Sequence, residues 1–238
     1  MDSKIWISVC NSVENLGPVG KFVANRLLRR ISVNAPTLLG YCFVCTVVHL
    51  LSCTLVPGLS RFLSIEDDYF GLNSTNPLTY LRLITHVLAH SSLDHLKGNL
   101  LYLLLVGPSV EHEFGSRNLL FVILIVAMFS AIAHIAVGSS NTHQLGASGV
   151  VFSFILLNSL VSATSNTIPL SFLITAVIWV GDELWKIIFS DDNVSHHAHL
   201  TGAIVGSCIG MYLHDRRAKQ LKNRSFASRL FGSKVKKR

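Results

Sequence analysis

Long apolar runs recur along this chain, and each is close to the length that crosses a lipid bilayer. A hydrocarbon core of about 30 Å is spanned by about 20 predominantly apolar residues in an α-helix. The chain is 50% hydrophobic and only 14% charged, which is too apolar for a soluble domain of 238 residues. The sequence therefore predicts an all-α polytopic membrane protein, a bundle of six transmembrane helices at about residues 37–56, 93–110, 118–137, 148–163, 168 to 185 or a little beyond, and 198–213.

Basic segments flank the apolar region and predict its domain organisation and orientation. Residues 1–35 form a basic N-terminal segment, in which apolar residues between 18 and 31 fall on one face, as in a helix that lies on a membrane surface. Residues 36–214 hold the six spans. Residues 215–238 carry ten of the twenty Lys and Arg residues and predict a disordered tail. The positive-inside rule places both termini in the cytoplasm, and the charge of the tails does not indicate nucleic-acid binding.

Two further segments are not explained by apolar runs alone. Residues 58–84 are the longest connection, and their moderate hydrophobicity and scattered aromatic residues predict a loop that rests on or dips into the membrane interface. Asp182, Glu183 and Lys186 lie near the outer end of the fifth span. Either this cluster holds the fifth span against the protein through ion pairs at helical spacing, or the span ends at about Val180 and the charges lie in water.

Polar groups of catalytic type occur at the outer ends of three predicted spans that run in the same direction. His95 and Asn99 lie at the start of the second span, Ser148 at the start of the fourth and His199 at the start of the sixth. Each lies only a few residues deep, at about 1.5 Å per residue. Polar residues inside a span are costly and are usually functional, so we expect these four side chains to share one site.

Ser148 lies between small residues, Gly146, Ala147 and Gly149, where the fourth apolar run begins. A helix N-terminus offers unpaired backbone N–H groups, which can hold an oxyanion formed when a serine hydroxyl attacks a carbonyl. The alternative is that Ser148 only caps the helix. Because Gly202 and Gly206 share a helix face with His199, the sixth span can approach the fourth closely enough for His199 to act as the base of Ser148.

At these residues the sequence resembles the rhomboid family of intramembrane serine proteases, in its short six-span form. The matching motifs, in chain order, are His90-x4-His95-x3-Asn99, Glu111-x3-Gly115, Gly146-Ala147-Ser148-Gly149 and Ala198-His199-x2-Gly202-x3-Gly206. Two positions depart from the common pattern, because Leu81-Arg82 stands where many members have Trp-Arg and Glu111-His112-Glu113 where many have Glu-x-Arg.

The resemblance implies a role for each of the matched residues. Ser148 would be the nucleophile and His199 the general base and acid, in a Ser–His dyad without an aspartate. His95 and Asn99 would form the oxyanion hole together with the Ser148 backbone N–H. His90, Gly146, Gly149 and Gly202 would support the site. The implied activity is endoproteolysis of single-span membrane proteins within the bilayer near its outer side, with no metal or other cofactor.

Other functions compete with this interpretation. A catalytically inactive rhomboid-like protein that binds membrane clients would lack the serine or the histidine, and this chain has both. A small transporter would place polar residues at mid-membrane on broken helices, whereas here they lie at the outer ends of the predicted spans. A zinc-dependent intramembrane protease is disfavoured because the chain has no His-Glu-x-x-His motif.

Overall fold

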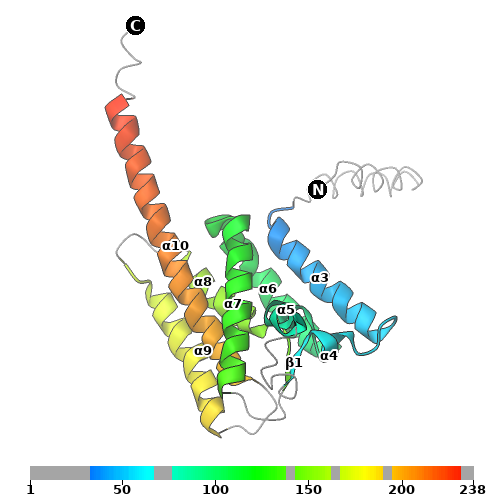
Figure 1. The fold of residues 1–238 in the computed structure, drawn as a ribbon. Coiled ribbons are helices and arrows are strands. Elements are labelled where there is room, and N and C mark those ends of the chain that lie inside the picture. Colours follow the sequence, from blue (N-terminus) through cyan, green and yellow to red (C-terminus); the bar gives the residue numbers. More distant parts are fainter. Residues whose placement is uncertain (1–32, 67–76, 138–142, 162–166, 190–194, 232–238) are drawn as a thin grey trace, which may run out of the picture. The chain divides into compact units, whose positions relative to one another are not determined.

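The computed structural model describes residues 33–66, 77–137, 143–161, 167–189 and 195–231. The helices belong to one compact unit, Ala35–Arg238, and the predicted interfacial helix at 18–31 lies outside the described residues. The structure is almost entirely helical (Figure 1). Its elements are α3 (Pro36–Cys53), α4 (Leu59–Leu63), β1 (Ile65–Glu66), α5 (Pro77–Thr85), the 3₁₀ turn η2 (His86–Leu88), α6 (Leu93–Phe114), α7 (Ser116–Val137), β2 (His143–Gln144), α8 (Ser148–Leu160), α9 (Leu170–Phe189) and α10 (His196–Phe231).

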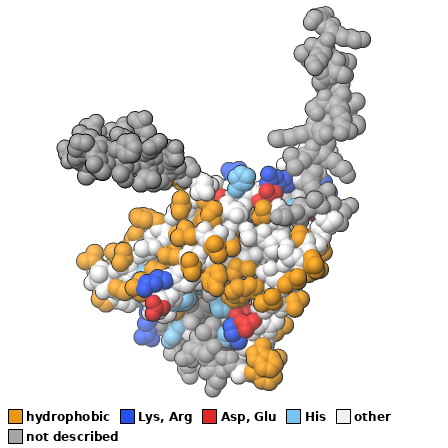
Figure 2. Space-filling model, turned by 180° about the vertical axis from the view of Figure 1, so that it is seen from behind, with side chains coloured by type: hydrophobic (Ala, Val, Ile, Leu, Met, Phe, Trp, Pro, Cys, Tyr) orange, Lys and Arg blue, Asp and Glu red, His pale blue; other side chains and the backbone are white. Residues whose placement is uncertain are grey.

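Each of the six predicted spans falls on a helix, namely α3, α6, α7, α8, α9 and α10. Among the described residues, α3 and α7 are long and apolar enough to cross a membrane by length and composition. Large apolar side chains are exposed on the outer faces of several helices, for example Phe43 on α3, Leu105 on α6 and Val177 on α9. Figure 2 shows hydrophobic side chains over the middle of one face, with charged groups near its ends. An apolar belt of this kind suits contact with lipid.

The centre of the unit is α8. It packs against α6, α7, α9 and α10, and most of its 13 residues are buried, from Gly149 to Leu160. A helix that is hydrophobic on all sides needs such surroundings. At 1.5 Å per residue α8 is only about 20 Å long, which is shorter than α6, α7, α9 and α10 around it.

A buried carboxylate ties α3 to α6. Glu111 is 3% exposed, and its two oxygens accept hydrogen bonds from the backbone N–H groups of Thr37 (3.0 Å) and Leu38 (2.9 Å). These N–H groups belong to the first turn of α3, where no partner exists within the helix and the dipole favours negative charge. The C-terminal end of α6 therefore lies beside the N-terminal end of α3, so the two helices run in opposite directions.

The structure differs from the sequence-based expectation in one connection and in the C-terminal segment. Residues 58–84 were expected to form a loop, but the described parts contain α4 and α5, which Arg82 links by donating to the carbonyl oxygen of Phe62 at 2.7 Å. Residues 215–238 were expected to be disordered, but α10 continues to Phe231. A preformed helix needs no new nucleus, and residues 214–231 contain neither Gly nor Pro, so nothing in this segment stops the helix.

The helix of the fifth predicted span, α9, continues a little beyond residue 185 to Phe189. The helix therefore does not end at Val180. Glu183 is 2% exposed, whereas Asp182 and Lys186 are about half exposed and pair with each other at 2.5 Å. The three charges therefore have different environments, and Glu183 alone points into the protein.

Close helix contact at two glycines generates the first prediction. A Cβ atom on Gly202 of α10 would lie 2.8 Å from the Cα atom of Gly149 on α8, closer than real Cβ contacts. We expect Gly202→Ala to separate the helices and to lower the free energy of unfolding by about 1–3 kcal/mol, the usual cost of overpacking. Thermal unfolding in detergent measures this change.

The matched control is Gly181→Ala on α9, where an added Cβ would meet nothing within 4 Å. This variant should be as stable as the wild type, or slightly more stable because alanine is the better helix former. Equal melting temperatures for Gly202→Ala and the wild type would contradict the close contact.

Candidate active site

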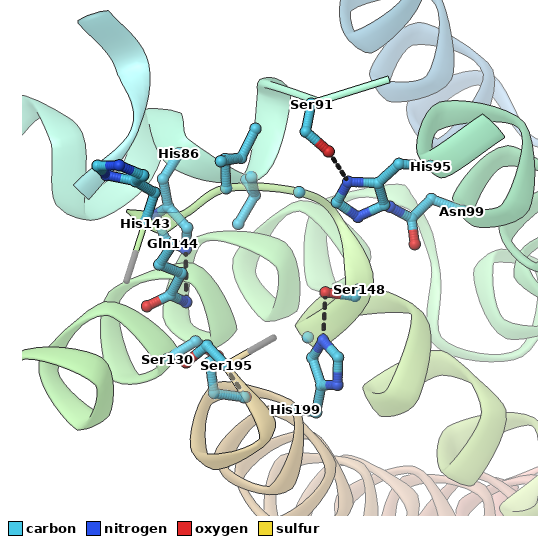
Figure 3. A pocket seen from close by; sticks show the side chains of 15 residues that line it. His86, Ser91, His95, Asn99, Ser130, His143, Gln144, Ser148, Ser195 and His199 are labelled. Carbon is cyan, nitrogen blue, oxygen red and sulfur yellow. Dashed lines mark hydrogen bonds between the residues drawn. The ribbon is translucent and has the colours of Figure 1, made fainter. Parts of the chain in front are cut away.

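Three helices begin at one cavity. The first turns of α6, α8 and α10 meet around a space of about 740 Å³ (Figure 3). His95, Asn99, Ser148 and His199 all line it, so the structure brings together the four side chains that the sequence placed at the starts of parallel spans. Histidine, amide and hydroxyl groups that converge in one cavity are a candidate site for catalysis.

Ser148 and His199 form a hydrogen bond across the contact between α8 and α10. The Ser148 Oγ and His199 Nε2 atoms are 2.7 Å apart (Figure 3). The imidazole of His199 stacks on Phe152, with ring centroids 4.8 Å apart and planes inclined by 15°. This stacking fixes the ring plane, so that one nitrogen faces Ser148.

Ser148 is not the helix cap. It is the first residue of α8, and the N-cap position is occupied by Ala147, which forms no side-chain cap bond. The hydroxyl of Ser148 is therefore engaged with His199 and not with the backbone of its own helix. The capping alternative that the sequence left open is excluded by this geometry.

The chain before Ser148 is held close to His95 by Gly146. Its φ angle is +117°, and a Cβ atom there would lie 2.7 Å from Nε2 of His95, so both the conformation and the space require glycine. The N–H of Gly146 donates to the carbonyl oxygen of His86 at 3.0 Å. Just before Gly146 in the chain, strand β2 pairs with β1, and Gln144 lies opposite Ile65. The loop is thus fixed from two sides.

His95 and Asn99 lie one turn apart on α6, on the face that lines the cavity. The Nδ1 atom of His95 is 3.1 Å from the Ser91 hydroxyl. Asn99 is 7% exposed, and its Nδ2 atom has no hydrogen-bond partner among the described residues. A buried amide donor without a partner is costly, which is the expected state of a group that binds a ligand atom absent from the free protein.

His90 and His86 support the loop without reaching Ser148. Nε2 of His90 accepts from the N–H of Ala147 at 3.5 Å, and its Nδ1 lies 3.3 Å from the carbonyl oxygen of Leu88. Nε2 of His86 lies 3.2 Å from the Gln144 amide. Burial lowers the pKa of both His86 and His90 from the ordinary 6.5 to about 4, so both are neutral near pH 7 and can accept as well as donate.

Gly149 lies where three helices touch. Its Cβ position would be 2.9 Å from the Ser130 hydroxyl of α7, and that hydroxyl donates to the carbonyl oxygen of Ala198 at 3.1 Å. The predicted supporting residues Gly149 and Gly202 are therefore found at the contacts that bring α10 against α8. Without a side chain at either position, His199 can approach Ser148.

Sequence reasoning missed the place of Glu183 in this site. Its Oε2 atom accepts from Nδ1 of His199 at 3.1 Å and from Nδ1 of His196 at 2.8 Å. The possible ligand atoms of these three residues lie within 4.8 Å of one another. Among the described residues, they form the group whose side-chain types and spacing could hold a metal ion. The signal in the sequence was the position of Glu183 inside the fifth apolar run. Its partners lie on another helix, so the spacing of residues along the chain does not identify them.

Comparison with known proteins identifies the family. The rhomboid domain model matches residues 77–216, more than half of the chain and the whole region of the cavity. The chain belongs to the rhomboid family. It is 26% identical to rhomboid-like protein 15 of Arabidopsis thaliana over 68% of this chain and 43% of that protein. It is also 26% identical to the rhomboid protease GlpG of Serratia proteamaculans, over 77% of this chain and 64% of that protein.

A further relative is the mitochondrial RHOMBOID-like protein 12 of Arabidopsis thaliana, 27% identical over 52% of this chain and 44% of that protein. This rhomboid spans between 43% and 64% of the length of these curated relatives. Family membership and the apolar helices make it a helical membrane protein, and rhomboid proteins act on transmembrane substrates within the bilayer.

Proposed function

We propose that this rhomboid is an intramembrane serine endopeptidase whose nucleophile is Ser148 and whose general base is His199. The observation that carries the proposal is the 2.7 Å hydrogen bond between Ser148 Oγ and His199 Nε2, at the start of a buried helix. A serine hydroxyl is a weak nucleophile until a base within hydrogen-bond reach can take its proton. This pair meets that requirement.

The proposed reaction follows from the groups around the serine. Ser148 Oγ attacks the scissile carbonyl carbon while His199 Nε2 takes the hydroxyl proton. The negative charge that forms on the carbonyl oxygen is held by His95, by the unpartnered Asn99 Nδ2 and by the Ser148 backbone N–H. His199 then gives its proton to the leaving amine. Water hydrolyses the acyl-enzyme by the same steps and restores the serine.

The membrane arrangement that fits this chemistry has six spans. In this proposal α3, α6, α7, α8, α9 and α10 cross or enter the bilayer, and residues 36–214 form the protease domain. The N-terminal segment and the tail after residue 214 are basic, which supports a cytoplasmic position for both. The starts of α6, α8 and α10, and with them the cavity, then face the outer side. A single-span substrate would unwind near that side and enter between α6 and α9.

The main alternative is a rhomboid-like protein that binds membrane clients without cleaving them. Such a protein has no need for a hydrogen-bonded serine and histidine or for a buried amide donor aimed at a cavity. The amide donor in particular is costly to bury without a partner. The geometry around Ser148 therefore favours proteolysis.

The first test is to remove each member of the pair. Ser148→Ala and His199→Ala should each abolish cleavage of a transmembrane substrate in proteoliposomes, because one removes the nucleophile and the other its base. Ser159→Ala provides the control, because it makes the same change on the same helix at a hydroxyl that bonds only to the helix backbone. Cleavage by folded Ser148→Ala at the wild-type rate would overturn the proposal.

Another prediction concerns the oxyanion. Asn99→Ala should lower kcat by roughly 10²-fold with little change in KM, as expected for a donor used mainly in the transition state. Asn118→Ala is the control, since the Asn118 amide donates to the carbonyl oxygen of Phe114 and neither residue lines the cavity. Steady-state kinetics separates the two parameters, and a change in KM alone would mean that Asn99 binds substrate uniformly.

A further prediction tests orientation. In a variant whose five cysteines are replaced by serine, a cysteine at exposed Arg61 should react with a membrane-impermeant thiol reagent added to intact cells. A cysteine at exposed His112 should react only after the membrane is permeabilised. The reverse pattern would place the cavity on the cytoplasmic side.

A further inference from the structure

We propose that Glu183 is a positioning residue for His199, so that Ser148, His199 and Glu183 act as a linked triad. The resemblance of the sequence to rhomboids implies a dyad without an acidic member, and this chain supplies a carboxylate from α9. The inference rests on the proposed protease function, and its test is designed so that the two can fail separately.

The geometry is that of an acid–base–nucleophile chain. Nε2 of His199 lies 2.7 Å from Ser148 Oγ, and Nδ1 of the same ring lies 3.1 Å from Oε2 of Glu183. The two ring nitrogens therefore face the two partners, one on α8 and one on α9. Glu183 is 2% exposed, so the carboxylate is shielded from water on the side that meets the histidine.

This contact fixes the tautomer of His199. An ionised carboxylate can only accept hydrogen bonds, so the proton of the neutral imidazole is held on Nδ1. Nε2 is then left with its lone pair toward the serine hydroxyl, which is the form a general base needs. Without an acceptor at Nδ1 the two tautomers would compete, and the one protonated on Nε2 cannot take the serine proton.

The carboxylate also favours the charged state formed during reaction. When His199 takes the serine proton it becomes a cation, and a negative charge 3.1 Å away stabilises it. The other groups facing this pair are His196, which donates to Glu183 Oε2 at 2.8 Å, and Lys186, whose Nζ lies 3.8 Å from Glu183 Oε1. His95 of α6 faces His199 across the cavity.

His196 completes the support of the carboxylate. It is 7% exposed, lies one turn before His199 on α10, and donates to the same oxygen. A buried carboxylate is tolerated only when hydrogen bonds replace its water. Two donors from α10 meet this need, so the same contact holds α9 against α10 and directs Glu183 toward His199.

The central experiment compares two carboxylate-to-amide changes at adjacent positions. Glu183→Gln keeps the shape of the side chain but removes its charge and offers an N–H that favours the wrong tautomer, so kcat should fall by at least about 10²-fold with KM nearly unchanged. Asp182→Asn makes the same change at a half-exposed residue paired with Lys186, and its kcat and KM should equal those of the wild type.

The outcomes separate the two proposals. If Ser148→Ala abolishes cleavage while folded Glu183→Gln retains the wild-type kcat, the protease function stands and the triad is wrong. If Ser148→Ala still cleaves, the protease proposal itself fails. A loss of activity on treatment with a chelator, restored by Zn²⁺, would also overturn the triad, because it would assign Glu183, His196 and His199 to a metal.

A second measurement does not depend on any variant of Glu183 folding. In wild-type protein labelled with ¹⁵N-histidine in detergent, the ring nitrogens of His199 can be assigned by their loss in His199→Gln. We expect the neutral ring to carry its proton on Nδ1, the nitrogen that faces Glu183. A neutral ring protonated on Nε2 would contradict the proposal.

Discussion

The contact between two glycines, Gly149 on α8 and Gly202 on α10, is the constraint on which the site depends. In lipid, helices gain little from burying apolar surface against each other, so close packing of small residues largely holds them together. Here the absence of both side chains lets the backbones touch. That approach places His199 at 2.7 Å from Ser148, so the chemical pair is a consequence of helix packing.

Several polar groups around this contact are hydrogen-bonded to a partner from another element. Ser130 of α7 donates to Ala198, His90 accepts from Ala147, and Glu183 of α9 accepts from His199. Hydrogen bonds in a low-dielectric interior are strong when they are complete and costly when one partner is missing. Asn99 lines the adjoining cavity, and its Nδ2 atom is one of several buried polar atoms with no hydrogen-bond partner among the described residues. This unused donor lies where the proposed oxyanion would form.

The family and the main helices could be predicted from the sequence, because apolar length and the spacing of His95, Asn99, Ser148 and His199 are local signals. The extent of α10 was predicted wrongly, because charge composition was read as disorder although an existing helix can continue through it. The contact of Glu183 with His199 could not be predicted. Both lie on different helices, and the rotation of α9 about its axis is set by packing that no spacing within α9 reveals.

The central claim is that helix packing makes Ser148 a nucleophile by placing His199 beside it. The most direct measurement is labelling of the protein in native membranes with a fluorophosphonate probe, followed by mass-spectrometric mapping of the modified residue. The account predicts modification at Ser148 in the wild type and none at Ser148 in a folded His199→Ala variant. Labelling of Ser148 at the same rate in both proteins, or labelling of another serine in place of Ser148, would contradict it.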